Sequence, residues 1–250
     1  MNPEPTTFHT ETARRPEGRF YIGMSLAALA IALAGFGPAA MGSGRREPIT
    51  LAVAAHGLVF LAWLALFITQ TVLISNRQLG MHRRLGYVGV VLAMLMVVSG
   101  YATAVAMARR GYDLSGDLIR GAGDPLELLV FQLGDLVSFS LLVGLAVWYR
   151  REPQVHKRLM LFATVGALLP AALTHIIGHS AVLREIKAPI ILVPLAVLLF
   201  AGAVHDRLSQ GRIHPVSLWV AVSMFIWANV RAAVIGPSKA WHEFAGWLIQ

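Results

Sequence analysis

The sequence contains no cysteine. Disulfide bonds, thiolate catalysis, iron–sulfur clusters and c-type haem attachment are therefore excluded together, because each of them needs a cysteine sulfur. A bound metal ion or haem would have to be held by histidine, methionine or carboxylate side chains. The chain also lacks a phosphate-binding loop, a GxSxG nucleophile motif and a dinucleotide fingerprint, so nothing in it indicates ATP-driven or covalent serine chemistry.

Charged residues are scarce as well. They make up 14% of the 250 residues, against 56% hydrophobic residues, and the mean hydropathy is +0.64. Lysine occurs only at positions 157, 187 and 239, outside the last hydrophobic segment, which excludes a retinal Schiff base of the rhodopsin type. This composition is typical of a protein whose solvent is largely lipid.

Long apolar runs are what the sequence has in abundance. A run of about 20 apolar residues is enough to cross a bilayer as a helix. Seven such runs are present, at 20–41, 50–75, 85–108, 127–149, 158–181, 188–205 and 214–236. The sequence therefore predicts an all-α, polytopic membrane protein with seven transmembrane helices.

The two ends of the chain differ from this membrane domain, which we place at 20–236. Residues 1–19 are polar and predict a disordered cytoplasmic tail. Residues 237–250 space their apolar side chains with the helical period, which predicts a short amphipathic helix on the membrane surface.

Basic residues predict how the bundle is oriented. The amino-terminal tail and the loops after spans two, four and six carry twelve of them: Arg14, Arg15, Arg19, Arg77, Arg83, Arg84, Arg150, Arg151, Lys157, Arg158, Arg207 and Arg212. The loops of the opposite side carry eight. This bias predicts a bacterial inner-membrane protein with a cytoplasmic amino terminus and a periplasmic carboxyl terminus. The net charge of +8 is assigned to topology and to anionic lipid headgroups of the bilayer, and no nucleic-acid partner is expected.

Polar residues inside the predicted spans are few and fall at one depth. The stretch THIIGH (174–179) places His175 and His179 on one helical face, because they are four residues apart. His56, Asp135 and Arg231 lie in three other spans. At a rise of ~1.5 Å per residue, all five fall in about the outer third of the membrane. Ionisable groups in spans usually face the bundle interior, so a shared outward-facing cavity is predicted.

Three interpretations of this cavity are open. His56, His175 and His179, with Asp135 as ligand or supporting residue, suit zinc with a bound water. Alternatively, His56 and one of the other two imidazoles would be axial ligands of haem b, with Arg231 neutralising Asp135 or a propionate. In the third interpretation, Asp135 pairs with Arg231 and the imidazoles bond to backbone carbonyls or headgroups.

These interpretations lead to different functions. The leading prediction is a haem-binding or metal-binding protein of the respiratory membrane, working in electron transfer or haem handling, with respiratory-chain proteins as partners. The alternatives are a zinc-dependent membrane hydrolase of a lipid-derived substrate, and a non-catalytic transporter or assembly factor in which Asp135 and Arg231 form a gating pair. The sequence does not decide whether the protein is an enzyme.

An internal similarity links two parts of the chain. MHRRLGYVGVVLAML (81–95) and VHKRLMLFATVGALL (155–169) both open with His, two basic residues and Leu. Spans two to three and four to five are thus interpreted as related helical hairpins. His82 and His156 stand at the mouths of these spans, where interfacial anchoring is the favoured role. His205 and His214 are interpreted as loop residues around the sixth turn.

Four segments carry a wider resemblance: AHGLVFLAWLALFITQTVLI (55–74), HRRLGYVGVVLAMLMVVSG (82–100), GDLVSFSLLVGLAVWYRREPQVHKRLMLFATVGALLPA (134–171) and HPVSLWVAVSMFIWANVRAAVIG (214–236). Together they resemble a widespread bacterial family of small seven-span membrane proteins with no assigned activity. The positions that match its polar pattern are His56, His82, Asp135, His156 and Arg231. His175 and His179 lie outside that pattern.

Two shorter resemblances concern haem. HKRLMLFATVGAL is similar to a helix of small membrane proteins associated with cytochrome oxidase assembly, and HRRLG is similar to span openings in b561-type cytochromes. Both resemblances imply a haem or respiratory context. The b561 arrangement needs a histidine in the fourth span, and this sequence has Gln132 and Asp135 there instead.

Overall fold

The computed structural model of the 250-residue chain describes residues 8–42, 48–111, 124–180 and 192–250. Over these ranges the protein is all-α, with no strand. Its long helices are α1 (Phe8–Ala40), α2 (Leu51–Ser75), α3 (Leu79–Arg110), α5 (Pro125–Trp148), α6 (Pro153–His179), α8 (Leu192–Gln210) and α9 (Pro215–Val230). A π-helical turn, η1 (Arg231–Ile235), continues α9, and the short helix α10 (Lys239–Leu248) follows.

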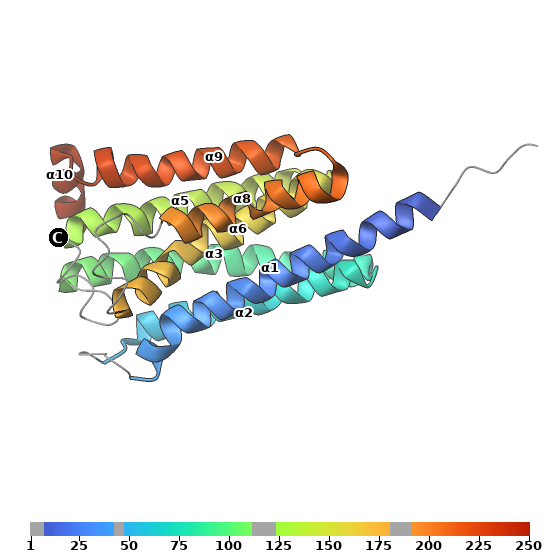
Figure 1. The fold of residues 1–250 in the computed structure, drawn as a ribbon. Coiled ribbons are helices and arrows are strands. Elements are labelled where there is room, and N and C mark those ends of the chain that lie inside the picture. Colours follow the sequence, from blue (N-terminus) through green and yellow to red (C-terminus); the bar gives the residue numbers. More distant parts are fainter. Residues whose placement is uncertain (1–7, 43–47, 112–123, 181–191) are drawn as a thin grey trace, which may run out of the picture.

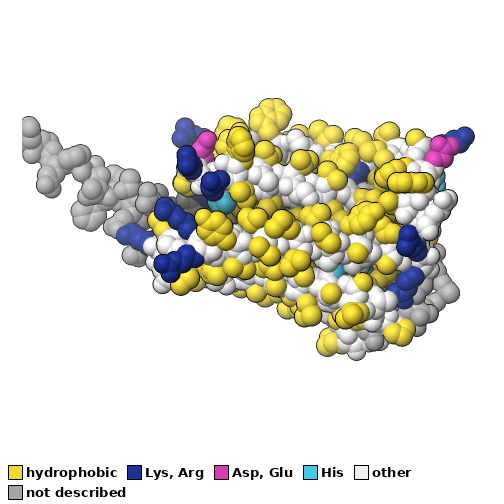
Figure 2. All heavy atoms as spheres, turned by 180° about the vertical axis from the view of Figure 1, so that it is seen from behind, with side chains coloured by type: hydrophobic (Ala, Val, Ile, Leu, Met, Phe, Trp, Pro, Cys, Tyr) yellow, Lys and Arg dark blue, Asp and Glu magenta, His cyan; other side chains and the backbone are white. Residues whose placement is uncertain are grey.

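Seven helices of the described part are long and apolar enough to cross a membrane, as the sequence predicts. Figure 2 shows basic side chains gathered at the two ends of the bundle and a largely hydrophobic flank between them. Helix α1 begins at Phe8, inside the segment 1–19 predicted as a disordered tail, although the apolar span itself starts only at Gly18.

Local sequence signals explain several helix starts. Thr50 caps α2 by accepting a hydrogen bond from the amide of Val53 (3.3 Å), and Asp124 caps α5 through the amide of Leu126 (2.8 Å). These side chains satisfy amides that have no partner within the helix. At the end of α3, Gly111 adopts φ of 72°, a left-handed conformation that glycine accommodates without strain.

The helices lie roughly parallel or antiparallel in one elongated bundle (Figure 1). Each of α1, α2, α3, α5 and α6 contacts the next in that order, and α6 returns to α1. The hairpin of α8 and α9 packs on the other side of α6. Helix α6 is therefore the central helix of the molecule.

The two ends of the bundle differ in how the helices are connected. The turn end holds the three short connections at 76–78, 149–152 and 211–214. The α10 end is the opposite one, where α10 packs against the start of α5 (Figure 1). The sequence predicts that the turn end faces the cytoplasm.

The core of the bundle combines large aromatic side chains with very close approaches between helices. Trp63 of α2 donates from Nε1 to the hydroxyl of Thr164 on α6 (3.2 Å) and meets the Phe139 ring edge to face at 5.0 Å. A Cβ atom on Gly35 would lie 2.5 Å from the carbonyl oxygen of Ala172, so α1 touches α6 backbone to backbone. Small residues allow this kind of packing between membrane helices.

Candidate functional site

An ion pair at the α10 end joins α5 to η1. Nη1 of Arg231 lies 2.7 Å from Oδ1 of Asp135 and also donates to the carbonyl of Phe131 (2.8 Å). The guanidinium sits over the rings of Phe131 and Trp227, with centroids 5.6 and 5.4 Å away. Only 5% of the Arg231 side chain and 15% of the Asp135 side chain are exposed. This is the pair that the third interpretation of the sequence predicts.

The backbone around this pair is adapted to it. A Cβ atom on Gly134 would lie 2.5 Å from Cδ and 2.6 Å from Nη1 of Arg231, so the arginine occupies space that any other residue would fill. The π-turn starts at Arg231 and closes with a bond from the Gly236 amide to the Arg231 carbonyl (2.9 Å). Such turns are frequent at functional sites. Nε of Arg231 is buried without a hydrogen-bond partner among the described residues.

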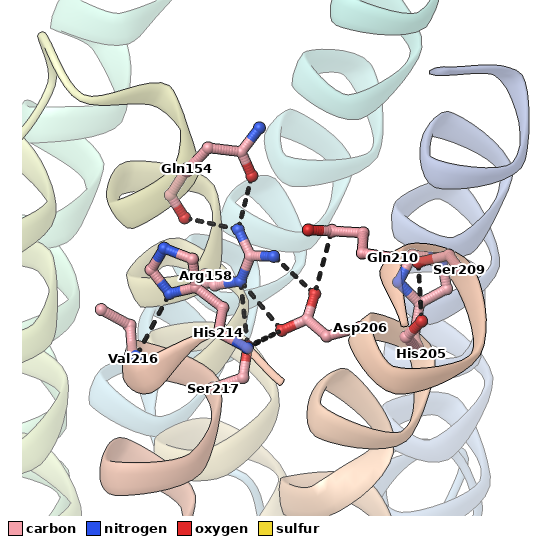
Figure 3. A network of polar contacts seen from close by, with 9 residues as sticks. All are labelled: Gln154, Arg158, His205, Asp206, Ser209, Gln210, His214, Val216 and Ser217. Carbon is pink, nitrogen blue, oxygen red and sulfur yellow. Dashed lines mark hydrogen bonds and ion pairs between the residues drawn. The ribbon is translucent and has the colours of Figure 1, made fainter. Parts of the chain in front are cut away.

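A second charge pair lies at the turn end and joins three helices (Figure 3). Arg158 of α6 contacts Asp206 of α8 through Nη2 and Oδ1 (2.5 Å) and through Nε and Oδ2 (3.2 Å). Ser217 of α9 donates to Oδ2 of Asp206 (2.5 Å) and accepts from Nε of Arg158 (2.9 Å). The two charged side chains are only 2% and 3% exposed.

The surroundings of this second pair satisfy its remaining groups. Nη1 of Arg158 donates to the backbone carbonyl (2.8 Å) and the side-chain oxygen (2.7 Å) of Gln154. The amide of His214 and the side chain of Gln210 donate to Asp206 (3.3 and 3.4 Å). Buried charges persist at low cost only with this kind of complete hydrogen bonding.

Helix α9 and its continuation η1 contact both pairs, through Ser217 as a hydrogen-bond partner of one and through Arg231 as a member of the other. Ser217 and Arg231 are fourteen positions apart, roughly 21 Å along a helix at 1.5 Å per residue. Met224 lies midway between them. A Cβ atom on Gly166 of α6 would lie 2.8 Å from the Met224 side chain and 2.9 Å from that of Leu199, so α6, α8 and α9 meet closely there.

The histidines predicted to share one cavity lie in different helix contacts. His56 bonds through Nδ1 to the hydroxyl of Ser99 (3.0 Å), between α2 and α3. His175 is buried, and its ring packs edge-on against Phe36 of α1 at 4.9 Å. The side chain of His179 lies outside the described part of the structure.

Among the described residues, no group of three or more His, Asp or Glu side chains is arranged to hold a metal ion. A hollow of about 520 Å³ does lie at the α10 end, between the last turns of α3 around Tyr101 and Arg109 and Leu248 at the end of α10. None of the five predicted site residues lines it. Haem or zinc binding by these residues therefore stays a prediction.

The interpretation of His205 as a loop residue is wrong, because α8 continues to Gln210. The His205 ring stacks on Phe20 of α1 with centroids 4.0 Å apart. His214 does lie in the connection, where its Nδ1 accepts from the Val216 amide (3.2 Å) and caps α9. Burial, with a smaller contribution from the Arg158 guanidinium, lowers the pKa of His214 below its usual value.

Sequence reasoning missed the pair of Arg158 and Asp206. Arg158 was counted as a topology marker, and Asp206 falls one residue past the predicted end of the sixth span at 205. The signal that could have found them is the scarcity of acids in the apolar helices. Besides Glu127 in the first turn of α5, only Asp135 and Asp206 lie in the seven spans. Each of these two aspartates has an arginine partner.

No family model, curated protein or solved structure matches the chain. The site is therefore interpreted from its own geometry. That geometry shows two buried charge pairs, one at each end of the membrane domain, of which one contacts Ser217 of α9 and the other includes Arg231 of η1.

Proposed function

We propose that the protein is a non-enzymatic membrane transporter in which the hairpin of α8 and α9, together with η1, rocks against α6 and α5. The observation that carries this proposal is the placement of the two charge pairs at opposite ends of this hairpin, each joining it to α6 or α5. Each pair would act as a gate: Asp135 and Arg231 at the α10 end, Arg158 and Asp206 at the turn end. This extends the gating role predicted for Asp135 and Arg231.

Energetics favours a functional role for such pairs. Removing two charges from water costs several kcal/mol per ion, and replacing a buried pair by apolar residues is often neutral or stabilising. Ionisable residues in membrane spans are correspondingly rare and usually functional. Two pairs that each bridge separate helices are better explained as contacts that open and re-form than as static supports.

The middle of α9 supports the same motion. The close approach of Met224 to Gly166 lies halfway between the pairs, where a rocking helix moves least. Breaking one pair would free that end of the α8–α9 hairpin while the other end stays held. Rocking of one bundle element about a central site is how many membrane carriers expose their site to one side at a time.

The neighbourhood of Arg231 indicates the kind of solute. Its Nε is a buried donor without a partner among the described residues, and Asp135 already neutralises the charge. A carboxylate or phosphate group could bind the guanidinium in place of Asp135, since arginine binds both through paired hydrogen bonds. We therefore propose a small anionic solute.

The absence of cysteine gives a clean test. Ala221 is fully buried on the α9 face between the pairs, so Ala221→Cys supplies one thiol in an otherwise thiol-free chain. In sealed vesicles, a membrane-impermeant maleimide should label it slowly from either side. Asp135→Asn should raise labelling from the α10 side by at least tenfold, and Asp206→Asn should do so from the turn side.

Controls separate gating from unfolding. The Ala221→Cys thiol must react fully after denaturation, and the exchange Asp135→Arg with Arg231→Asp should restore protection. Protection that persists in both neutralised variants would overturn the proposal. So would labelling from both sides in either variant, which would show general loosening.

Haem or zinc binding at His56, His175, His179 and Asp135 is a separate proposal with its own test. Haem would give a Soret band that shifts on reduction with dithionite. Zinc would appear as about one ion per chain by elemental analysis and be lost in His179→Ala. A colourless and zinc-free protein would end both alternatives.

A further inference from the structure

The repeated His and basic-residue motif has a structural counterpart at the turn end. His82 is the fourth residue of α3 and His156 is the fourth residue of α6. Although 74 positions separate them, their rings meet edge to face, with centroids 6.3 Å apart and planes at 82°. The internal similarity thus brings two imidazoles together at the turn end, and neither of them belongs to a charge pair.

The hydrogen bonds of His156 define which ring nitrogen is available. Its Nδ1 lies 2.7 Å from the carbonyl oxygen of Ala146. A carbonyl oxygen can only accept, so Nδ1 carries the hydrogen and Nε2 of the neutral ring keeps its lone pair. This arrangement, a ring N–H donated to a carbonyl, is also how proteins orient histidines that bind metals.

Two polar atoms at this site are buried without hydrogen-bond partners among the described residues: Nδ1 of His82 itself and Oε1 of Gln70. Gln70 is fixed next to His82, because its Nε2 donates to the His82 backbone carbonyl (3.2 Å). A buried polar atom without a hydrogen bond costs free energy, and each such atom needs an explanation. A ligand for these atoms is the simplest one.

We propose that Nδ1 of His82, Nε2 of His156 and Oε1 of Gln70 bind a divalent transition-metal ion. All three atoms can present a lone pair, and imidazole nitrogens favour zinc and copper. Two imidazoles bound at 2.0–2.1 Å to one metal have ring centroids roughly 5–6.5 Å apart, and the pair already falls in this range. A water molecule would complete four-coordination.

The positive charges near the site are compensated or directed away. Arg158 is paired with Asp206, and the ammonium group of Lys157 lies over the Tyr21 ring at 5.6 Å from its centroid. Arg83 and Arg84 are exposed, so water and salt weaken the field of these two charges at the site. With three neutral ligands, the bound ion would keep its full charge.

Metal titration of the purified full-length protein in detergent tests the proposal. After removal of metals with a chelator, equilibrium dialysis against Zn²⁺ should give one tightly bound ion per chain. His82→Ala and His156→Ala should each weaken binding by at least tenfold. Gln70→Glu should tighten binding, because a carboxylate replaces a neutral oxygen, and this gain cannot come from misfolding.

The matched control is His242→Gln, which removes an imidazole at the other end of the bundle and should leave binding unchanged. Cu²⁺ electron paramagnetic resonance adds a structural readout: couplings to two nitrogens in the wild type and to one in each histidine variant. The double variant His56→Ala with His175→Ala should still bind, which separates this site from the predicted outer one.

Two results would overturn the proposal. One is Zn²⁺ binding that is equal in the wild type, His82→Ala and His156→Ala. The other is a wild-type protein that binds no more Zn²⁺ than the double variant His82→Ala with His156→Ala, together with a Gln70→Glu variant whose Zn²⁺ affinity equals that of the wild type. Either result would leave a bridging water as the partner of these three atoms.

Discussion

At the scale of single residues, Gly134 decides where the Arg231 side chain can lie. The guanidinium passes over the bare backbone of α5 at residue 134 and so reaches the carboxylate of the next residue, Asp135. The atoms that a Cβ would strike belong to the flexible Arg231 side chain, not to backbone. A methyl group here would therefore displace the arginine and leave the helices where they are.

Gly134→Ala should accordingly break the pair of Asp135 and Arg231 while the bundle stays folded. We expect the Ala221→Cys thiol to become reactive from the α10 side, as in Asp135→Asn. Gly144→Ala is the matched control, because a Cβ at Gly144 of the same helix meets nothing within 4 Å. An unchanged labelling rate in Gly134→Ala would show that Arg231 finds another route to Asp135.

Arg158 and Asp206 form the more buried pair. The loss of stability on substitution should differ strongly between removing one partner and removing both. Arg158→Leu leaves the Asp206 carboxylate buried without its partner, which costs about 3–5 kcal/mol in comparable pairs. The double variant Arg158→Met with Asp206→Leu leaves no stranded charge and should recover most of that stability. Thermal unfolding in detergent measures both.

The two variants also separate stability from function. If the pair works as a gate, the double variant should be stable yet expose Ala221→Cys to reagent from the turn side. If the double variant is as unstable as the single one, the hydrogen-bonded network of Gln154, Arg158 and Asp206 has a structural role instead.

At the scale of helices, α10 is attached to α5 by contacts that include a titrating group. Trp241 donates from Nε1 to the Leu126 carbonyl (2.7 Å), and Ala245 is fully buried. Near this contact, Nδ1 of His242 bonds to the Ser238 carbonyl (2.9 Å), and its Nε2 lies 3.2 Å from the Asp124 carboxylate. The Ser238 carbonyl first, and Asp124 in addition, raise the pKa of His242.

Docking of α10 should therefore weaken as pH rises. A histidine whose pKa is raised in the folded state stabilises that state fully below its ordinary pKa of about 6.5, and the contribution disappears as pH passes the raised value. Hydrogen exchange of the α10 amides, corrected for intrinsic rates, should show more protection at pH 6 than at pH 8. His242→Gln should remove this difference, and a difference that persists would assign it to another group.

Helices were easier to predict from the sequence than the site, for a physical reason. Apolar length alone specifies a membrane helix, so the seven spans follow from hydrophobic runs. The end of a span is less sharply encoded: α8 runs on to Gln210, five residues past the predicted end at 205, and so places Asp206 in the interior. That shift is why one charge pair was missed.

Depth along the membrane predicted which polar residues share a level but not which of them touch. His56, His175 and Asp135 do lie toward the α10 end, yet His56 faces α3, His175 faces α1 and Asp135 faces η1. The direction in which a helix presents a side chain depends on its neighbours, and one sequence does not specify these. The pairing of Asp135 with Arg231 could be predicted because opposite buried charges need each other.

At the scale of the whole molecule, the structure reduces the charge bias from which the orientation is predicted. Arg158, one of the twelve basic residues counted at the turn end, is buried and neutralised by Asp206, so it is no marker of a loop. Removing it leaves eleven against eight. The positive-inside rule counts loop residues near span ends, so it still favours a cytoplasmic turn end.

Thiol labelling of intact cells tests this orientation. Asn76→Cys, in the exposed connection between α2 and α3, should be protected from an impermeant maleimide, and Gln250→Cys, just beyond α10, should be labelled. The opposite pattern would invert the protein in the membrane and exchange the sides to which the two charge pairs face. The helix packing would be the same, but the proposed His82 and His156 site would then face the opposite side of the membrane.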